Sequence, residues 1–177
     1  MTILFSGGCK NGKSSLAEDC AVALAGSAPL YYIATMIPHD DEDRLRIRRH
    51  IASRDGKGFI TLEQGTDLCA CLDRADAGGT FLLDSVTAIL SNEMFSGGID
   101  LVAGERTARD LERFAGAVKN AVFVSDFIYS DDGRYDDFTE NYRRALALCD
   151  RTLARVCDAV AEISLGCATM YKGELPL

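Results

Sequence analysis

The residues with the clearest chemistry lie near the amino terminus and form the pattern G-x-x-x-x-G-K-S. The pattern is filled by Gly7, Gly8, Cys9, Lys10, Asn11, Gly12, Lys13 and Ser14. Its glycines let the backbone turn so that successive N–H groups converge on an anion, and a helix that starts there adds partial positive charge. The lysine of such a loop reaches the outer phosphates of a nucleotide, and the serine hydroxyl binds Mg²⁺. We therefore expect these eight residues to bind a nucleoside triphosphate, with Lys13 on its phosphates and Ser14 on the metal ion.

The residues around this loop have the pattern that such a motif needs. The apolar run Ile3-Leu4-Phe5 precedes the loop, and residues 14–24 have the pattern of a helix, so the loop joins a strand to a helix. Glycine-rich loops also join strands to helices without binding a ligand. The complete motif in this context favours nucleotide binding.

A second candidate is His50, which belongs to an expected helix over residues 41–54. Arg46, His50 and Arg54 are four residues apart and therefore share one helix face. An imidazole flanked by two guanidiniums favours its neutral form, which leaves a ring nitrogen free to attack phosphorus. The alternative, which spacing alone favours, is a solvated histidine among salt bridges. His39, in the loop after Pro38, has nothing special nearby in the sequence.

A third candidate is the carboxylate that ends the apolar run Phe81-Leu82-Leu83-Asp84. In phosphate-loop folds an acid after a buried strand helps to hold the Mg²⁺ shell. Strands that end in aspartate are common, so the assignment of Asp84 as a metal-binding residue depends on the phosphate loop.

Together these motifs resemble the bifunctional adenosylcobinamide kinase / adenosylcobinamide-phosphate guanylyltransferase family in order and spacing. Besides the loop, the resemblance is carried by Tyr32-Ile33-Ala34-Thr35, Asp41-Glu42, Arg46-Ile47-x-x-His50-x-x-x-Arg54, Thr61-Leu62-Glu63, Leu83-Asp84-Ser85-Val86-Thr87 and Leu90-Ser91-Asn92. This resemblance favours a functional role for His50.

The resemblance implies two reactions at one nucleotide site. The first is phosphorylation of adenosylcobinamide with GTP or ATP, and the second is transfer of GMP from GTP, through a guanylyl-histidine, to give adenosylcobinamide-GDP in cobalamin biosynthesis. His50 would carry the GMP, Lys13 would assist catalysis, and Ser14 and Asp84 would bind Mg²⁺. The implied nucleotide contacts outside the loop are Ala34, Thr35, Met36, Ile51, Ala52, Ser53, Arg54, Glu63 and Asp84. The family's trimers imply a homo-oligomer.

The second half of the chain departs from the family pattern. Residues 124–129 read V-S-D-F-I-Y where the family has V-T-N-E-V-G, and residues 142–151 keep only the aromatic-Arg start of F-R-D-x-x-G-x-x-N-Q. The loop has Cys9-Lys10 in place of a small residue and arginine. These differences concern the acceptor, so a kinase or nucleotidyltransferase of another small molecule is an alternative. A non-catalytic nucleotide-binding regulator is a second alternative, although His50 with Glu63 and Asp84 favours an enzyme.

The composition limits the class of protein. A chain of 177 residues fits a single nucleotide-binding domain over residues 1–177. The formal net charge of −8 argues against nucleic acid as a partner. No apolar stretch approaches the roughly 20 residues that span a bilayer, and the amino terminus lacks a signal-peptide pattern. We expect a cytoplasmic protein.

The seven cysteines are odd in number and include no C-x-x-C pair. Most lie in apolar surroundings, which predicts buried, reduced thiols rather than disulfides or a metal site. Cys9 differs from the others because it lies in the phosphate loop.

Apolar runs alternate with amphipathic ones along the chain. This alternation predicts an α/β fold, and with the loop a P-loop NTPase-like three-layer fold with a mostly parallel central sheet. We expect strands near residues 3–6, 30–34, 58–62, 80–84, 121–125 and 159–164. Helices are expected near residues 14–24, 41–54, 67–75, 86–95, 105–119 and 138–157. Residues 126–137 are expected to form a surface loop at the carboxyl end of a strand, where ligands usually bind in such sheets.

Overall fold

A computed structural model describes residues 1–38, 40–130 and 133–177, and only the backbone of Arg46. His39 therefore lies outside the described residues, as does the side chain of Arg46. In chain order the elements are β1 (Thr2–Gly7), α1 (Lys13–Ala25), β2 (Leu30–Ala34), α2 (Asp41–Ser53), β3 (Ile60–Glu63), the 3₁₀ helix η1 (Leu68–Arg74), β4 (Thr80–Asp84), α3 (Val86–Phe95), α4 (Ala103–Ala117), β5 (Asn120–Asp126), α5 (Asp137–Val156), β6 (Ala159–Ser164) and β7 (Cys167–Lys172).

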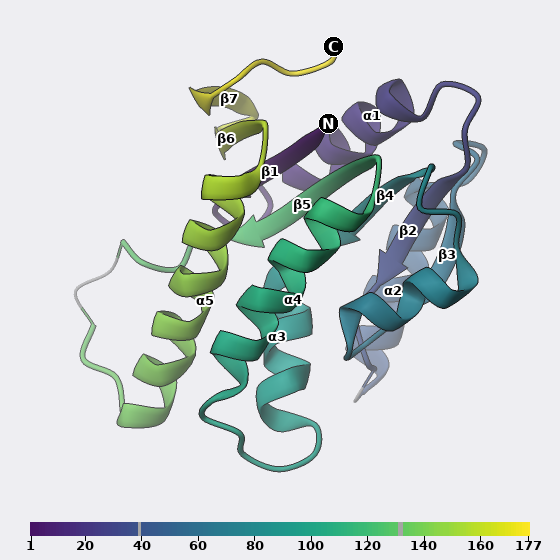
Figure 1. Cartoon of the computed structure of the whole chain (residues 1–177). Helices are drawn as coiled ribbons and strands as arrows, with labels where there is room; N and C mark the ends of the chain where they lie inside the picture. Colours follow the sequence, from purple (N-terminus) through teal and green to yellow (C-terminus); the bar gives the residue numbers. More distant parts are fainter. Residues whose placement is uncertain (39, 131–132) are drawn as a thin grey trace.

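The strands form one sheet in the order β3-β2-β4-β5-β1-β6-β7, in which only the β6–β7 pair is antiparallel. Helices α3, α4 and α5 lie together over one face of the sheet, and α1 lies over the other (Figure 1). The expected three-layer α/β fold with a mostly parallel sheet is confirmed. The six strands β3, β2, β4, β5, β1 and β6, in their order across the sheet, are parallel. Their carboxyl ends therefore meet at one edge of the sheet, where the candidate site residues lie.

The central strands are buried on both faces, as their continuous apolar sequences predict. In β1 the side chains of Ile3 and Phe5 face α1, whereas Leu4 faces the layer of α3, α4 and α5. In β4 the ring of Phe81 stacks on Tyr31 at 4.8 Å between centroids and meets Phe114 of α4 edge-on at 5.4 Å. This apolar packing holds the strand ends in fixed relative positions.

Side-chain caps start two helices directly beside the site. The Asp40 carboxylate accepts a hydrogen bond from the Asp43 N–H and so begins α2, whose first turn is acidic as the helix dipole favours. Ser85 follows β4 at once, and its Oγ accepts from the Ala88 N–H to begin α3. The chain therefore turns from strand to helix within one residue of Asp84.

Most expected elements lie where the sequence predicted them, with three differences. The third strand was expected at residues 58–62 but spans Ile60–Glu63, and the expected helix at 67–75 is the 3₁₀ helix η1. Strand β7 was not expected, because all six of its residues are exposed and no buried face marks it. It pairs with β6 through a turn in which both Leu165 (φ 53°) and Gly166 (φ 77°) are left-handed, as two-residue hairpins of this twist require.

Four cysteines are buried, as expected. They are Cys20, Cys71, Cys149 and Cys157. Burial raises the pKa of Cys20 to about 11 and that of Cys149 to about 12, so these thiols are unreactive near neutral pH. Cys9 and Cys167 are exposed, and every cysteine is free. None of the helices within the described residues is long and apolar enough to cross a bilayer.

Candidate active site

The phosphate loop joins the end of β1 to the start of α1, as its sequence predicted. Gly12 adopts φ 89°, a left-handed conformation that disfavours other residues, immediately before the helix. Gly7 ends β1 so close to the neighbouring strand that a Cβ there would collide with the carbonyl of Ile163. These two glycines allow the loop to turn tightly against the sheet and then enter α1.

Lys13 lies in the mouth of this loop. Its side chain is only 6% exposed, and its Nζ donates a hydrogen bond to the Gly8 carbonyl at 2.7 Å. The same ammonium forms an ion pair with Asp126 Oδ1 at 3.0 Å. The lysine that the motif assigns to phosphates therefore has a carboxylate partner in this structure.

Asp84 is buried next to Ser14. Its side chain is 10% exposed, and burial raises the pKa of this carboxyl, while a hydrogen bond from Ser14 and the nearby charges of His50 and Lys13 act in the opposite direction. Its Oδ2 has no hydrogen-bond partner among the described residues. A buried carboxylate oxygen without a donor, beside a serine hydroxyl, fits the oxygen ligands that Mg²⁺ prefers.

No cluster of three or more histidine, cysteine, aspartate or glutamate side chains suited to a metal occurs in the described part of the chain. A magnesium ion at Ser14 and Asp84 would need nucleotide phosphates and water as its further ligands. Mg²⁺ is usually bound in this way in nucleotide-using enzymes.

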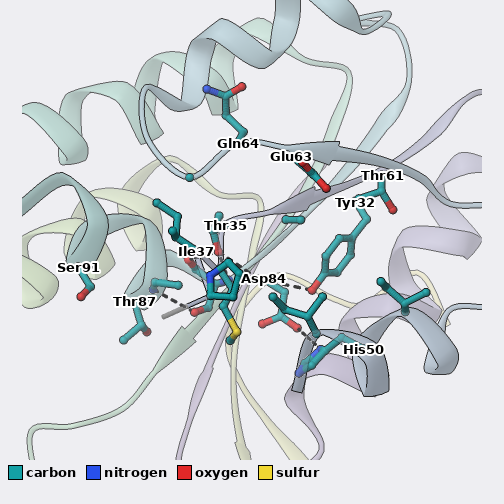
Figure 2. Close-up of a pocket in the computed structure, with 18 of the residues that line it drawn as sticks. Tyr32, Thr35, Ile37, His50, Thr61, Glu63, Gln64, Asp84, Thr87 and Ser91 are labelled. Carbon is teal, nitrogen blue, oxygen red and sulfur yellow. Dashed lines mark hydrogen bonds and ion pairs between the residues drawn. The ribbon is translucent and has the colours of Figure 1, made fainter. Parts of the chain in front are cut away.

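His50 extends from the last turns of α2 toward Asp84 (Figure 2). Its Nδ1 lies 3.9 Å from Asp84 Oδ2, and its side chain is 29% exposed. With Nδ1 facing the carboxylate, Nε2 is the ring nitrogen left for a covalent bond. The nucleophile expected from sequence thus lies beside the expected metal-binding carboxylate.

Arg54 is turned inward at the end of α2. Its side chain is 6% exposed, and its guanidinium carbon lies 3.3 Å from the centroid of the Tyr32 ring. This stacking fixes the plane of the guanidinium. Its Nη1 is buried without a hydrogen-bond partner among the described residues, so a polar group remains available to a ligand. The other expected flank of His50, Arg46, has no described side chain.

A cavity of about 850 Å³ opens between α2 and the carboxyl ends of β2, β3 and β4 (Figure 2). Eight of the expected site residues line it, namely Ala34, Thr35, Met36, His50, Ile51, Arg54, Glu63 and Asp84. Ala52 and Ser53 lie outside its lining: Ala52 is exposed, and Ser53 Oγ donates to the His50 carbonyl and to Glu18. The phosphate loop lies outside the lining too, but it reaches the cavity edge because Lys13 contacts Asp126, which lines the cavity.

Several lining residues were not predicted as site residues from the sequence. They are Tyr32, Thr61, Gln64, Thr87, Ser91, Asp126 and Tyr142. The sequence could have indicated Asp126 as a site residue, because it ends an apolar strand just as Asp84 does. No sequence pattern could have indicated Tyr142, because α5 approaches the cavity only in the folded chain. There the Tyr142 hydroxyl donates to the Thr87 carbonyl at 3.0 Å.

Hydrogen bonds lock the strand ends around the cavity. Thr35 is buried, and its Oγ1 accepts from the Ser85 N–H at 3.1 Å, which joins the ends of β2 and β4. The Asn92 side-chain amide donates to the carbonyls of Thr35 at 2.6 Å and Gly65 at 2.8 Å. Asn92 of α3 thereby holds the segments after β2 and β3 together.

A buried carboxylate also connects α1 to α2. Glu18 of α1 accepts a hydrogen bond from Lys57 Nζ at 2.6 Å and another from Ser53 Oγ at 3.3 Å. The hydrogen bond with Glu18 raises the pKa of Lys57. The helix that follows the phosphate loop is thus tied to the end of the helix that carries His50.

Known proteins similar to this chain show the family to which it belongs. A family model described as cobinamide kinase / cobinamide phosphate guanyltransferase matches residues 3–170 of the chain. The chain belongs to this family. A relative, the bifunctional adenosylcobalamin biosynthesis protein CobP of Pseudomonas aeruginosa, is 31% identical over 175 residues, which is 98% of this chain and 99% of CobP.

Solved structures that resemble this member of the cobinamide kinase family share the fold at low identity. One, an ATPase domain, matches with a TM-score of 0.52 and 9% identity, over 91% of this chain and 68% of that one. The flagellar accessory protein FlaH of Methanocaldococcus jannaschii matches with a TM-score of 0.51 and 12% identity, over 98% of this chain and 78% of FlaH. These likenesses support the P-loop NTPase-like fold.

Proposed function

We propose that this protein acts in cobalamin biosynthesis as an adenosylcobinamide kinase and adenosylcobinamide-phosphate guanylyltransferase. Family membership supports the pair of activities, and the name of the Pseudomonas aeruginosa relative supports the pathway. The observation that carries the proposal is the 3.9 Å distance between His50 Nδ1 and Asp84 Oδ2. A nucleophile beside the phosphate and metal ligands is what nucleotidyl transfer requires, whereas a regulatory switch requires none.

The phosphates of GTP or ATP would bind the N–H groups of the loop from Gly7 to Ser14, with Lys13 on the outer phosphates. Mg²⁺ bound by Ser14 and Asp84 would neutralise charge on the transferred group. The buried Oδ2 of Asp84, which accepts no hydrogen bond from the described residues, supports this assignment.

The nucleoside would occupy the cavity under α2. The end of β2 (Ala34, Thr35 and Met36) and Glu63 would contact it, together with the turn from Ile51 to Arg54. Arg54 offers its Nη1, which has no hydrogen-bond partner among the described residues. Ala52 has only a methyl side chain and the Ser53 hydroxyl is already hydrogen-bonded, so these two residues would contribute mainly through their backbone.

In the kinase reaction, the acceptor's hydroxyl oxygen bonds to the γ-phosphorus, and the bond from that phosphorus to the bridging oxygen breaks. The nucleoside diphosphate leaves, and the hydroxyl proton is released. Lys13 would stabilise the charge that develops on the phosphoryl oxygens.

In the guanylyltransferase reaction, His50 Nε2 attacks the α-phosphorus of GTP, and the bond to the β-phosphate oxygen breaks so that pyrophosphate leaves. A phosphate oxygen of adenosylcobinamide phosphate then attacks the same phosphorus. The nitrogen–phosphorus bond breaks, His50 is regenerated, and a diphosphate links the corrinoid to guanosine. Two displacements replace one difficult transfer, which is the physical advantage of the covalent intermediate.

Further features of the proposal concern assembly and location. We propose that residues 1–177 form one nucleotide-binding domain, because the described strands belong to a single sheet. We propose a trimer, as the family resemblance implies, and a cytoplasmic enzyme, in keeping with its free thiols.

The deciding experiment is incubation with Mg²⁺ and GTP labelled in its α-phosphate. We expect label on the protein and release of pyrophosphate, with an adduct that is labile to acid and stable to alkali, as nitrogen–phosphorus bonds are. His50→Ala should lose the label and still bind GTP, and added adenosylcobinamide phosphate should remove label from the wild-type protein. Absence of label on the wild-type protein, or label that survives in His50→Ala, would favour a kinase of another small molecule.

A further inference from the structure

Asp126 is held at a central point of the site. It ends β5, the strand between β1 of the phosphate loop and β4 of Asp84. Its N–H donates to Thr87 Oγ1 at 3.0 Å, and the next N–H, of Phe127, donates to the Gly7 carbonyl at 2.9 Å. These bonds fix the backbone on both sides of the carboxylate, so the side chain lies between the phosphate loop and the cavity.

The carboxylate of Asp126 contacts Lys13 and lines the cavity. The ion pair with Lys13 uses Oδ1, and the side chain is 32% exposed. A bound nucleotide would bring its outer phosphate to within a few ångströms of Lys13, and therefore close to Asp126. A carboxylate so near a polyanion is repelled by it unless a cation or a proton offsets the carboxylate's charge, since like charges repel.

The carboxylates of Asp84 and Asp126 differ in a way that assigns them different tasks. Asp84 is buried against Ser14, an environment suited to a metal ion. Asp126 is 32% exposed and lines the cavity, so its carboxylate is accessible to a molecule that enters the cavity next to Lys13. An acceptor alcohol needs a group that orients its hydroxyl toward phosphorus and takes its proton.

We propose that Asp126 binds the acceptor's hydroxyl group and serves as its general base in the kinase reaction, an inference that rests on the proposed kinase activity. The hydroxyl donates a hydrogen bond to the Asp126 carboxylate. As its oxygen bonds to the γ-phosphorus, the proton moves to Asp126, the bond to the bridging oxygen breaks, and the nucleoside diphosphate leaves with that electron pair. The proton then passes from Asp126 to solvent.

The test uses Asp126→Asn, which keeps the shape of the side chain and an oxygen for Lys13 but cannot accept the proton. Asp73→Asn, an exposed aspartate of η1, is the matched control. The phosphorylation rate is measured with adenosylcobinamide and GTP in single turnover, and labelling of His50 by α-labelled GTP reports nucleotide binding in the same samples.

We expect Asp126→Asn to slow phosphorylation about 100- to 10,000-fold, the usual contribution of a positioned general base, with labelling of His50 within about threefold of the wild-type value. Phosphorylation within about threefold of wild type would overturn the proposal. So would an equal loss of phosphorylation and labelling, because Asp126 would then act only by positioning Lys13. Absence of phosphorylation by the wild-type protein would overturn the proposed function itself, and the role of Asp126 with it.

Discussion

Replacing Lys13 with alanine tests whether the phosphate loop binds the nucleotide. A hydrogen bond to a charged group contributes about 1.5–3 kcal/mol. Loss of the ammonium also removes the positive charge that pairs with Asp126, which lies 3.0 Å from Lys13 Nζ. The Asp126 carboxylate would then repel the phosphates. Both effects weaken binding, and solvent screens the second because Asp126 is one-third exposed. We expect a loss of about 2–3 kcal/mol, which is a rise in Kd of roughly 30- to 150-fold.

The assay is isothermal titration with GTP and Mg²⁺, with thermal unfolding followed in parallel to show that the fold is intact. Lys119→Ala removes an exposed lysine at the opposite end of β5 and serves as the matched control. The double variant Lys13→Ala/Asp126→Asn should bind GTP several-fold more tightly than Lys13→Ala, because the uncovered carboxylate is gone. A Kd for Lys13→Ala within twofold of wild type would refute nucleotide binding by this loop.

Two further predictions concern single side chains of the site. Exposed Cys9 should be protected from mild thiol alkylation by GTP and Mg²⁺, as mapped by mass spectrometry, while buried Cys149 stays unmodified throughout; equal labelling of Cys9 with and without GTP would contradict this. Asp84→Asn should raise the melting temperature at neutral pH and abolish Mg²⁺-dependent turnover. Burial raises the pKa of Asp84, so the folded state binds its proton more tightly, and the ionised carboxylate costs stability once the pH exceeds the ordinary aspartate pKa. The gain in melting temperature should therefore vanish at low pH, and a gain that persists there would refute this cause.

The local parts of the site could be predicted from sequence because each is defined by neighbours in the chain. The loop from Gly7 to Ser14 needs only a strand before it and a helix after it, and both are present. Asp84 is the last residue of the buried strand β4, and helical spacing predicted that His50 and Arg54 share one face, although Arg54 lies just past the end of α2. The resemblance then predicted that these three segments act together, and His50 and Asp84 do lie 3.9 Å apart.

Other features could not be predicted because they depend on contacts between distant segments. Tyr142 reaches the cavity from α5, and Glu18 connects α1 to α2 through Ser53 and Lys57. Strand β7 has no buried face, so no hydrophobic pattern marks it. Arg54 was expected beside His50 on a helix face, but at the end of α2 its guanidinium stacks on Tyr32.

Local sequence was sufficient to predict the α/β class, the phosphate loop and the candidate metal-binding carboxylate, because motif spacing and apolar runs are properties of neighbouring residues. The choice of His50 as the candidate nucleophile also required the family resemblance. The position of β5 between β1 and β4 emerges only from the folded chain, and with it the contact of Asp126 with Lys13 at the mouth of the loop. The order of the strands depends on how the helices and strands of the whole chain bury their apolar faces on both sides of one sheet. That arrangement is set by contacts among many distant residues, which the spacing within one motif does not encode.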